Sequence, residues 1–504
     1  MDNLKGKRIF IFQQRLWGTN FGYFLAKKLQ AEGCLLGALT STKRTHDFFV
    51  SQAEVRHEII VSFDEILGNP EKYLAGDDFP LQEICQALQI DSVWPIARTV
   101  REYIRSYKDK YGYGFKQNVP DETIVLYIKA VYKCLKKVFS EFKPDIIIAP
   151  NFVSLHHIMF NLYAKAQGIK MISFFGCKIK GVSLFYYDYL NSEGPFFDRV
   201  EELYRGEAES QNIEKAKQYI SGFRKEFKRL TYAPKIDNKK KSLRQIIKSH
   251  LAPWANIARW YWRRPEKAWE VVGVSPDFRP PYFILRDYIA SKRYKHFADN
   301  FEYYPLDKIK KFIYMPLQVQ PEIAIDVAAP FFSNQLEVAR LVAMSLPEDY
   351  VLVVRDAPAM VGRRTPSYME KLARTPNVKL VDYRVSTQEV LGRADLVVSF
   401  GGTTLAEAAF YSKPGIQVGD FGITLKLPNV VKHTDMTTLA SKIKEVLKVN
   451  LNNQEYERKL EKYVAANYDA GYEVDFFDVW YGQDKELAES AWQIYKAEIE
   501  KLTR

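Results

Sequence analysis

The sequence predicts an α/β protein made of two Rossmann-like lobes, with a basic, tryptophan-rich and largely helical insert between them. Apolar runs typical of buried strands alternate with helical patterns over the first 200 residues, and the same alternation returns from Lys308. The section between these two units interrupts the alternation and carries an excess of lysine and arginine. A chain of 504 residues is also too long for a single hydrophobic core, so at least two domains are expected.

These observations divide the chain into four predicted parts. They are a first Rossmann-like lobe at 1–205, a basic insert at 206–307, a second Rossmann-like lobe at 308–450 and a C-terminal helical tail at 451–504. The polar and helical pattern of the tail does not indicate where it docks.

The first lobe opens with a β-α-β pattern and continues as alternating strands and helices. The run DIIIAP at 145–150 is apolar throughout, which is typical of a strand buried on both faces of a parallel sheet. The expected strands are 7–14, 34–42, 145–150 and 170–176, and the expected helices are 21–33, 123–142 and 153–168.

The second lobe shows a more regular alternation, which strongly indicates a doubly wound sheet. Its expected strands are 310–318, 350–358, 378–383, 395–400 and 414–419. Its expected helices are 334–347, 367–376, 386–394 and 403–412.

Composition limits the cellular setting. No run of about 18 apolar residues is present, so we expect no membrane-spanning helix. The N-terminus lacks the long apolar run and cleavage site of a signal peptide, and we expect a cytoplasmic protein. Four scattered cysteines, Cys34, Cys85, Cys134 and Cys177, show neither metal nor redox spacing, which fits a reducing compartment. A net charge of +12 favours binding to an anionic partner.

The insert holds most of this excess charge, with roughly two dozen basic residues against about ten acidic ones over 210–310. Trp254, Trp260, Trp262 and Trp269 lie among its arginines and lysines. Such a mixture suits the headgroup layer of an anionic leaflet, so we expect peripheral association with the inner face of the cytoplasmic membrane. The alternative is a packed, solvated helical insert. Because no nucleic-acid motif accompanies the charge, no nucleic-acid partner is expected.

The central motif lies between a buried strand and a helix at 394–419. Gly401 and Gly402 allow close approach of a ligand to the backbone, and Thr403 and Thr404 open the helix. Free N–H groups and the helix dipole at this point favour a phosphate group. Glu407 lies one turn further on and could accept hydrogen bonds from a ribose diol. The alternative is a capping box, with a threonine as N-cap and the glutamate near N3.

This motif resembles that of the capsule polysaccharide biosynthesis family, which includes transferases that add Kdo from CMP-Kdo. The resemblance covers about 308–445 and rests on Gly402–Ala408, Ser412–Pro414 and the segments 314–322 and 376–386. A further segment, Arg355–Pro358 with Gly362–Arg364, is similar to the family's basic segment, although Ala357 stands where the family has histidine. The first lobe matches only in general design, with a turn at Gly18, Thr19 and Asn20.

The resemblance implies a two-lobed GT-B glycosyltransferase, with an acceptor lobe followed by a nucleotide-sugar lobe. The implied reaction serves capsule or O-antigen-type polysaccharide synthesis and transfers a sugar such as Kdo from CMP-Kdo to a glycan or lipid-linked acceptor. The nucleotide sugar is a substrate, and no separate cofactor is expected. Two alternatives remain: a nucleotide-sugar epimerase on the same fold, and a non-catalytic assembly subunit, which Ala357 would suit.

Polar residues that follow strand ends supply the remaining candidates, because ligands of open sheets bind at the carboxyl ends of strands. Glu322, Asp356, His156 and His157 are candidate catalytic groups, with an ion pair as the alternative for Asp356 and packing as the alternative for the histidines. Gln318, Gln320, Arg355 and Arg363 are candidate donor-binding residues, with Arg364 beside them. No Asp-x-Asp element accompanies a strand end, so no metal site is expected.

Overall fold

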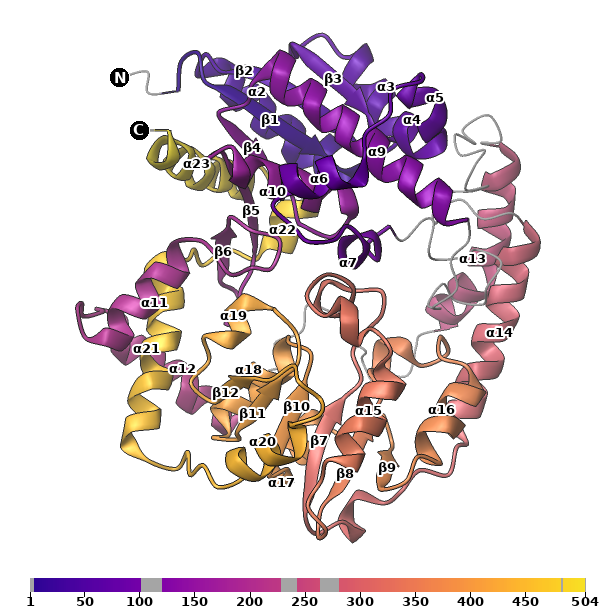
Figure 1. Cartoon of the computed structure of the whole chain (residues 1–504), viewed down its shortest axis with the longest axis vertical. Coiled ribbons are helices and arrows are strands. Elements are labelled where there is room, and N and C mark those ends of the chain that lie inside the picture. Colours follow the sequence, from indigo (N-terminus) through magenta and orange to yellow (C-terminus); the bar gives the residue numbers. More distant parts are fainter. Residues whose placement is uncertain (1–3, 101–119, 228–242, 263–280, 482–483, 504) are drawn as a thin grey trace.

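The computed structural model describes residues 4–100, 120–227, 243–262, 281–481 and 484–503, and it places two six-stranded sheets in two lobes (Figure 1). The predicted fold class is confirmed, since each sheet is covered by helices on both faces. The lobes are stacked along the long axis of the molecule, and the chain passes between them more than once.

The sheet of the first lobe has the order β3-β2-β1-β4-β5-β6. The four predicted strands run parallel together with β3, and β6 pairs antiparallel with β5 at the edge. The short strands β3 and β6 were not predicted, because four-residue apolar runs carry too little periodicity to be distinguished from loops. The strands are β1 (Arg8–Gln13), β2 (Leu35–Thr40), β3 (Ile59–Ser62), β4 (Ile146–Ile148), β5 (Lys170–Gly176) and β6 (Ser183–Tyr186).

Alternation along β1 divides the core of this lobe into two layers. Phe10 and Phe12 point to one face and pack with α9 and α10, whereas Ile9 and Ile11 point to the other face and pack with α2. The helices are α1 (Arg15–Trp17), η1 (Gly18–Gly22), α2 (Tyr23–Ala31), α3 (Lys43–Ser51), α4 (Phe63–Gly68), α5 (Pro70–Leu74), α6 (Leu81–Leu88), α7 (Trp94–Ala97), α9 (Asp121–Lys137), η2 (Val138–Phe142) and α10 (Leu155–Ala166).

The sheet of the second lobe is parallel throughout and has the order β12-β11-β10-β7-β8-β9. In both lobes the first strand therefore lies beside the fourth, which is the doubly wound order with its switch point between these two strands. The strands are β7 (Phe312–Pro316), β8 (Val351–Arg355), β9 (Val378–Val381), β10 (Leu396–Ser399), β11 (Gly415–Gln417) and β12 (Val430–Lys432). The α-helices are α15 (Gln335–Met344), α16 (Pro366–Ala373), α17 (Thr387–Arg393), α18 (Thr403–Phe410), α19 (Gly422–Leu425) and α20 (Leu439–Val446).

The 206–307 section contributes to two different places. Helix α12 (Ile213–Lys225), together with α11 (Pro195–Arg205), packs against the second lobe, where Arg224 donates from Nε to the Phe410 carbonyl at 2.7 Å. Helices α13 (Leu243–Trp262) and α14 (Pro281–Asp299) form a hairpin along one edge of the molecule (Figure 1). The basic residues 239–241, 263 and 264 lie outside the described residues. None of the described helices is long and apolar enough to span a bilayer.

The C-terminal tail forms α21 (Gln454–Ala470), α22 (Phe476–Tyr481) and α23 (Lys485–Leu502). Helix α21 packs with α11 and α12, and α23 returns to the first lobe and closes the face of its sheet that carries Ile9 and Ile11. Trp492 and Tyr495 are buried there, and ion pairs at the rim join Lys28 to Glu489 and Lys496 to Glu32. The first lobe is therefore complete only when the last helix of the chain has docked.

This docking leads to a stability prediction. Trp492→Ala should lower the free energy of unfolding of the first lobe by about 3–5 kcal/mol, the usual cost of emptying a large aromatic site. Urea denaturation measures the effect. Ser490 is exposed on the same helix, and Ser490→Ala should change the value by less than about 0.5 kcal/mol. Equal stabilities of the two variants would contradict the docking of α23.

Candidate functional site

The Gly401–Gly402 turn lies at the switch point of the second sheet, directly after β10. Both glycines have positive φ values, 139° and 95°, which residues with a Cβ rarely adopt. Gly402 is the N-cap of α18, so Thr403 is the first helical residue, and the N-cap residue has no side chain that could cap the helix. The capping-box alternative is therefore wrong for this helix. The first N–H groups of α18 keep their capacity to bind an anion.

The two glycines serve different purposes. A Cβ on Gly401 would lie 2.8 Å from the Cβ of Phe421, so this position is filled by packing. A Cβ on Gly402 would meet nothing closer than the Oε1 of Gln318 at 3.7 Å. Open space therefore lies beside Gly402, where a ligand can approach the helix terminus.

Gln318 follows β7 and brings a polar side chain to the same place. Its Nε2 donates to the Ser399 hydroxyl at 3.3 Å, and its backbone carbonyl accepts from Arg364 at 2.6 Å. Gln335 holds the Gln318 backbone N–H at 2.8 Å. Gln318 is partly exposed and can reorient toward a ligand at the Gly402 turn.

Gln320 instead has a structural environment. Its side chain is buried, where Nε2 donates to the Ser333 carbonyl at 3.1 Å and Oε1 accepts from Gln335 at 3.1 Å. These bonds fix the loop that follows β7. Two residues of the same polar pattern, Gln318 and Gln320, thus differ in their access to the turn.

Arg355 is also engaged within the lobe. Its guanidinium donates to the Tyr314 hydroxyl at 3.2 Å, to the Val385 carbonyl at 2.5 Å and to the Thr387 hydroxyl at 2.7 Å. These bonds join β8 to β7 and to the start of α17, and they use three of the five N–H donors of the guanidinium.

Asp356 and Arg364 form a buried ion pair at 2.8 Å. Burial raises the pKa of the Asp356 carboxyl, and the positive charge of Arg364 opposes this rise. Asp356 also accepts from the Ala357 backbone N–H at 2.8 Å, so the pair braces the turn after β8. Arg363 is exposed on that turn, beside α14.

Lys178 is a candidate that the sequence pattern did not single out. It follows β5 in the first lobe, yet its Nζ lies 4.9 Å from the ring centroid of Phe421 in the second lobe. Among the described residues it forms no hydrogen bond or ion pair. Burial lowers the pKa of its ammonium, while Glu322 and Glu407 lie close enough to raise it. Its place after a strand end was an available signal, but only the packed lobes bring it to the Gly401 turn.

The two candidate carboxylates near Lys178 differ in exposure. Glu322 is exposed at the start of η5 (Ile323–Val327), and Glu407 is buried within α18. The structure therefore brings several predicted site residues to one place, namely Gly401, Gly402, Gln318, Glu322 and Glu407. Lys178 and Phe421, which the sequence pattern did not single out, lie beside them.

His156 and His157 lie on the other side of the lobe boundary, in α10. Both are buried and lie against the ring of Phe12, and the ring centroids of His156 and Phe63 are 3.8 Å apart. The His157 Nδ1 is paired with the Ser154 hydroxyl at 3.0 Å, whereas neither ring nitrogen of His156 has a partner among the described residues. Burial lowers the pKa of His157 to about 3 and that of His156 well below its usual value. Both rings are therefore neutral near physiological pH.

Three neutral side chains follow the neighbouring strands β1, β2 and β4 of the same lobe. They are Gln14, Ser41 and Asn151, and each is partly exposed. The Oε1 of Gln14, the Oγ of Ser41 and the Oδ1 of Asn151 are nevertheless shielded from solvent and unpaired within the described part of the chain. Because unpaired polar atoms are costly, these oxygens are candidate acceptors for ligand hydroxyl groups. Common residue types such as these give no distinctive motif in the sequence.

The buried histidines lead to a pH prediction. Between about pH 6.5 and 3 the unfolded chain binds a proton at His157 that the folded chain does not, so stability is fully present above this window and falls as the pH drops through it. His157→Asn should reduce this loss of stability, by at most about 1.4 kcal/mol for each pH unit within the window. Urea denaturation at several pH values measures the slope, and His296→Gln, at an exposed histidine, should leave it unchanged. A His157→Asn slope equal to the wild-type slope would refute the assignment.

The Gly402 turn leads to a binding prediction. Gly402→Val should abolish nucleotide binding, because a branched side chain would fill the open space beside the α18 N-terminus. The fold should survive, since the position is not packed, although the backbone strain should cost about 1–3 kcal/mol. Calorimetric titration with nucleotide measures binding, and circular dichroism checks the fold. Unchanged affinity in a folded variant would show that the ligand lies elsewhere.

Comparison with known proteins gives distant structural similarity only. No protein-family model and no curated protein sequence matches the chain. Among solved structures, the Staphylococcus aureus MnaA–UDP co-structure is 11% identical, with 98% of this chain and 97% of that chain covered and a TM-score of 0.27. The Thermosulfurimonas dismutans KpsC, a β-Kdo 2,7 transferase, is 11% identical over 66% of this chain and 78% of that chain, with a TM-score of 0.33. A Methanocaldococcus jannaschii UDP-GlcNAc 2-epimerase is 9% identical over 88% and 94%, with a TM-score of 0.27.

Proposed function

We propose that this protein is a glycosyltransferase that moves a sugar from a nucleotide-activated donor to a hydroxyl group of an acceptor held between the two lobes. The observation that carries the proposal is the N-terminus of α18, with glycine as its N-cap, behind the open Gly402 turn, and Lys178 supplied by the opposite lobe. A helix terminus and an ammonium group together stabilise the negative charge that develops on a departing phosphate. Such a site requires no metal ion for this purpose.

Each residue of this site has a proposed role. The N–H groups that follow Gly402, with the hydroxyls of Thr403 and Thr404, would bind the donor phosphate. Glu407 would accept hydrogen bonds from the ribose. Glu322 is the preferred general base, because it is exposed and lies near Lys178, whereas the carboxylate of Asp356 is buried.

The first lobe favours transfer over epimerisation. The unpaired oxygens of Gln14, Ser41 and Asn151 lie at the carboxyl ends of three adjacent strands, where an open sheet binds its ligand. These side chains carry no charge, which suits a neutral hydroxylated acceptor. An epimerase needs no second substrate at this position.

The finer assignment rests on the motif resemblance. We propose a donor of the CMP-Kdo type, a glycan or lipid-linked acceptor, and a role in capsule or O-antigen-type polysaccharide synthesis at the cytoplasmic side of the membrane. No cofactor other than the donor is proposed.

A donor panel tests the reaction. The protein is incubated with CMP- and UDP-activated sugars, with and without glycan acceptors, and free nucleotide and sugar products are measured. Acceptor-dependent release of nucleotide supports transfer. Conversion of the donor sugar without nucleotide release would instead identify an epimerase. A protein that binds nucleotide but turns over no donor would fit the non-catalytic alternative.

Lys178 supplies a sharper prediction. Lys178→Met should weaken binding of the nucleotide by roughly 10–100-fold, the effect expected from losing one charged partner of a phosphate. Lys178→Arg should retain part of the affinity because the charge remains. Lys180→Met is the matched control, since Lys180 lies two residues further on and is exposed. If calorimetry gives Lys178→Met the same nucleotide affinity as the wild type, Lys178 is not part of the nucleotide site.

A further inference from the structure

Helix α13 carries a row of large apolar side chains that the rest of the molecule leaves uncovered. The exposed fractions are 57% for Ile247, 58% for Leu251, 60% for Trp254, 59% for Tyr261 and 88% for Trp262. Ile247, Leu251 and Trp254 are spaced by four and three residues, Tyr261 lies two turns after Trp254, and Trp262 follows directly, so all five side chains share one face about 100° wide. We refer to these five residues as the α13 stripe.

The opposite face of α13 packs on the protein. Pro253 is buried, and Ser249, Ile257 and Trp260 are partly buried. The His250 Nδ1 pairs with the Tyr288 hydroxyl of α14 at 2.5 Å, which ties the two helices together. The helix is therefore held on one side, and the α13 stripe is left free on the other.

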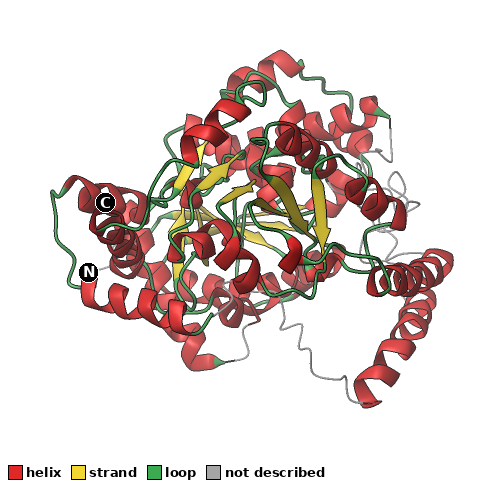
Figure 2. Ribbon diagram, turned by 90° about the horizontal axis from the view of Figure 1, so that it is seen from below, coloured by secondary structure: helices red, strands yellow, loops and turns green. Residues whose placement is uncertain are grey.

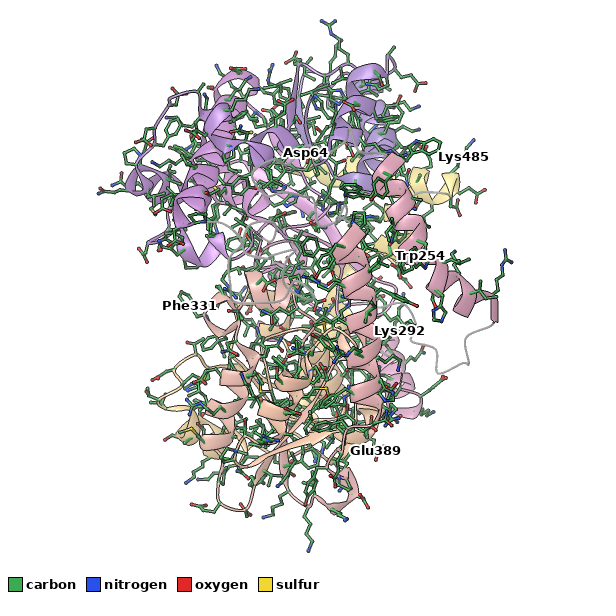
Figure 3. All side chains as sticks on the ribbon, turned by 90° about the vertical axis from the view of Figure 1, so that its right-hand side faces the viewer. Asp64, Trp254, Lys292, Phe331, Glu389 and Lys485 are labelled. Atoms are coloured by element: carbon green, nitrogen blue, oxygen red, sulfur yellow. The ribbon has the colours of Figure 1, made fainter. Side chains whose placement is uncertain are left out.

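The hairpin is fixed to the second lobe through α14. Ala290 and Ala298 are buried, and Asp299 accepts from Lys295 at 2.7 Å and from the Tyr383 hydroxyl at 2.5 Å. Gly362 approaches Ser291 so closely that a Cβ there would lie 3.0 Å from the Ser291 carbonyl oxygen. The helices at the right-hand edge of Figure 2 project from the body of the molecule, and Figure 3 faces this edge, with Trp254 and Lys292 labelled on it.

The charge around the stripe has one sign. Exposed Arg244, Lys248 and Arg259 flank it, and α13 contains no aspartate or glutamate. Exposed Lys292 and Arg293 of α14 add to the same edge. An apolar stripe bordered by basic residues suits a surface with an apolar interior and anionic headgroups. A second copy of this helix would bring like charges together, which disfavours a symmetric dimer through this face.

We propose that the α13 stripe is a membrane-surface contact, which lies in the headgroup layer of an anionic bilayer and holds the protein there reversibly. Trp254, Tyr261 and Trp262 would lie at the level of the headgroups, where aromatic side chains with a polar edge are favoured. Leu251 and Ile247 would reach the acyl boundary. The basic flank supplies the electrostatic attraction, so binding weakens with salt. This inference does not depend on the proposed transfer reaction.

Sedimentation with vesicles tests the proposal. The full chain should bind vesicles of equal parts phosphatidylglycerol and phosphatidylcholine at low ionic strength, and bind pure phosphatidylcholine vesicles far less. The triple variant Arg244→Gln, Lys248→Gln, Arg259→Gln should lose roughly two orders of magnitude in partitioning, since each cation near such a surface contributes about a factor of five. The double variant Leu251→Ser, Trp254→Ser should lose about tenfold or more in partitioning, because less apolar surface would be buried in the bilayer.

Matched controls separate the stripe from the rest of the surface. Met344→Ser changes a residue that is 70% exposed on α15, and Lys371→Gln removes an exposed charge of α16; both should bind vesicles like wild type. Nucleotide affinity should be unchanged in the α13 variants, which also reports that they fold. The proposal is overturned if the wild type ignores anionic vesicles or if the α13 variants bind them equally well. It is also overturned if sedimentation velocity shows a dimer that the double variant abolishes, because the stripe would then join two copies.

Discussion

The backbone contact between Gly422 and Leu190 is the constraint on which the arrangement of the two lobes depends. The Gly422 N–H donates to the Leu190 carbonyl at 2.9 Å, and a Cβ on Gly422 would lie 2.4 Å from the Cα of Ser192. The loop that supplies Leu190 is shaped by buried Asp188, which accepts from the backbone N–H groups of Ser192 and Glu193 at 2.6 and 2.7 Å. Only glycine allows the two backbones to meet at this separation.

The same segment also builds the candidate site. Phe421 immediately precedes Gly422, packs on Gly401 and lies beneath the ammonium of Lys178. Gln417 holds this segment by donating to the carbonyls of Gly419 and Phe421 at 2.9 and 3.1 Å. A displacement of the lobes would therefore move Lys178 relative to the Gly402 turn. The proposed anion site and the contact between the lobes are parts of one packed unit.

Polar residues after strand ends were good candidates in the sequence, but their surroundings divide them into two groups. Gln318 and Glu407 lie with Lys178 near the Gly402 turn, while Gln320, Arg355 and Asp356 form bonds that stabilise the loops of the second lobe. Both groups follow strands, because strand ends need polar side chains for loop closure as well as for ligand binding. Local sequence cannot separate these uses, since the partners, such as Thr387 for Arg355, come from distant positions.

The sequence by itself determined the fold class and the strands and helices that have a clear apolar periodicity. Continuous apolar runs indicated parallel strands, helical spacing indicated the covering helices, and the Gly-Gly pair marked a turn in which both residues have positive φ. The tertiary structure alone decided the order of the strands, the return of α23 to the first lobe and the placing of Lys178 beside Phe421. It also decided that one apolar face of α13 is covered and the other is exposed. The physical reason is that periodicity reports only that a residue is apolar or polar, whereas the partner that covers or pairs with it is chosen by packing between segments far apart in the chain.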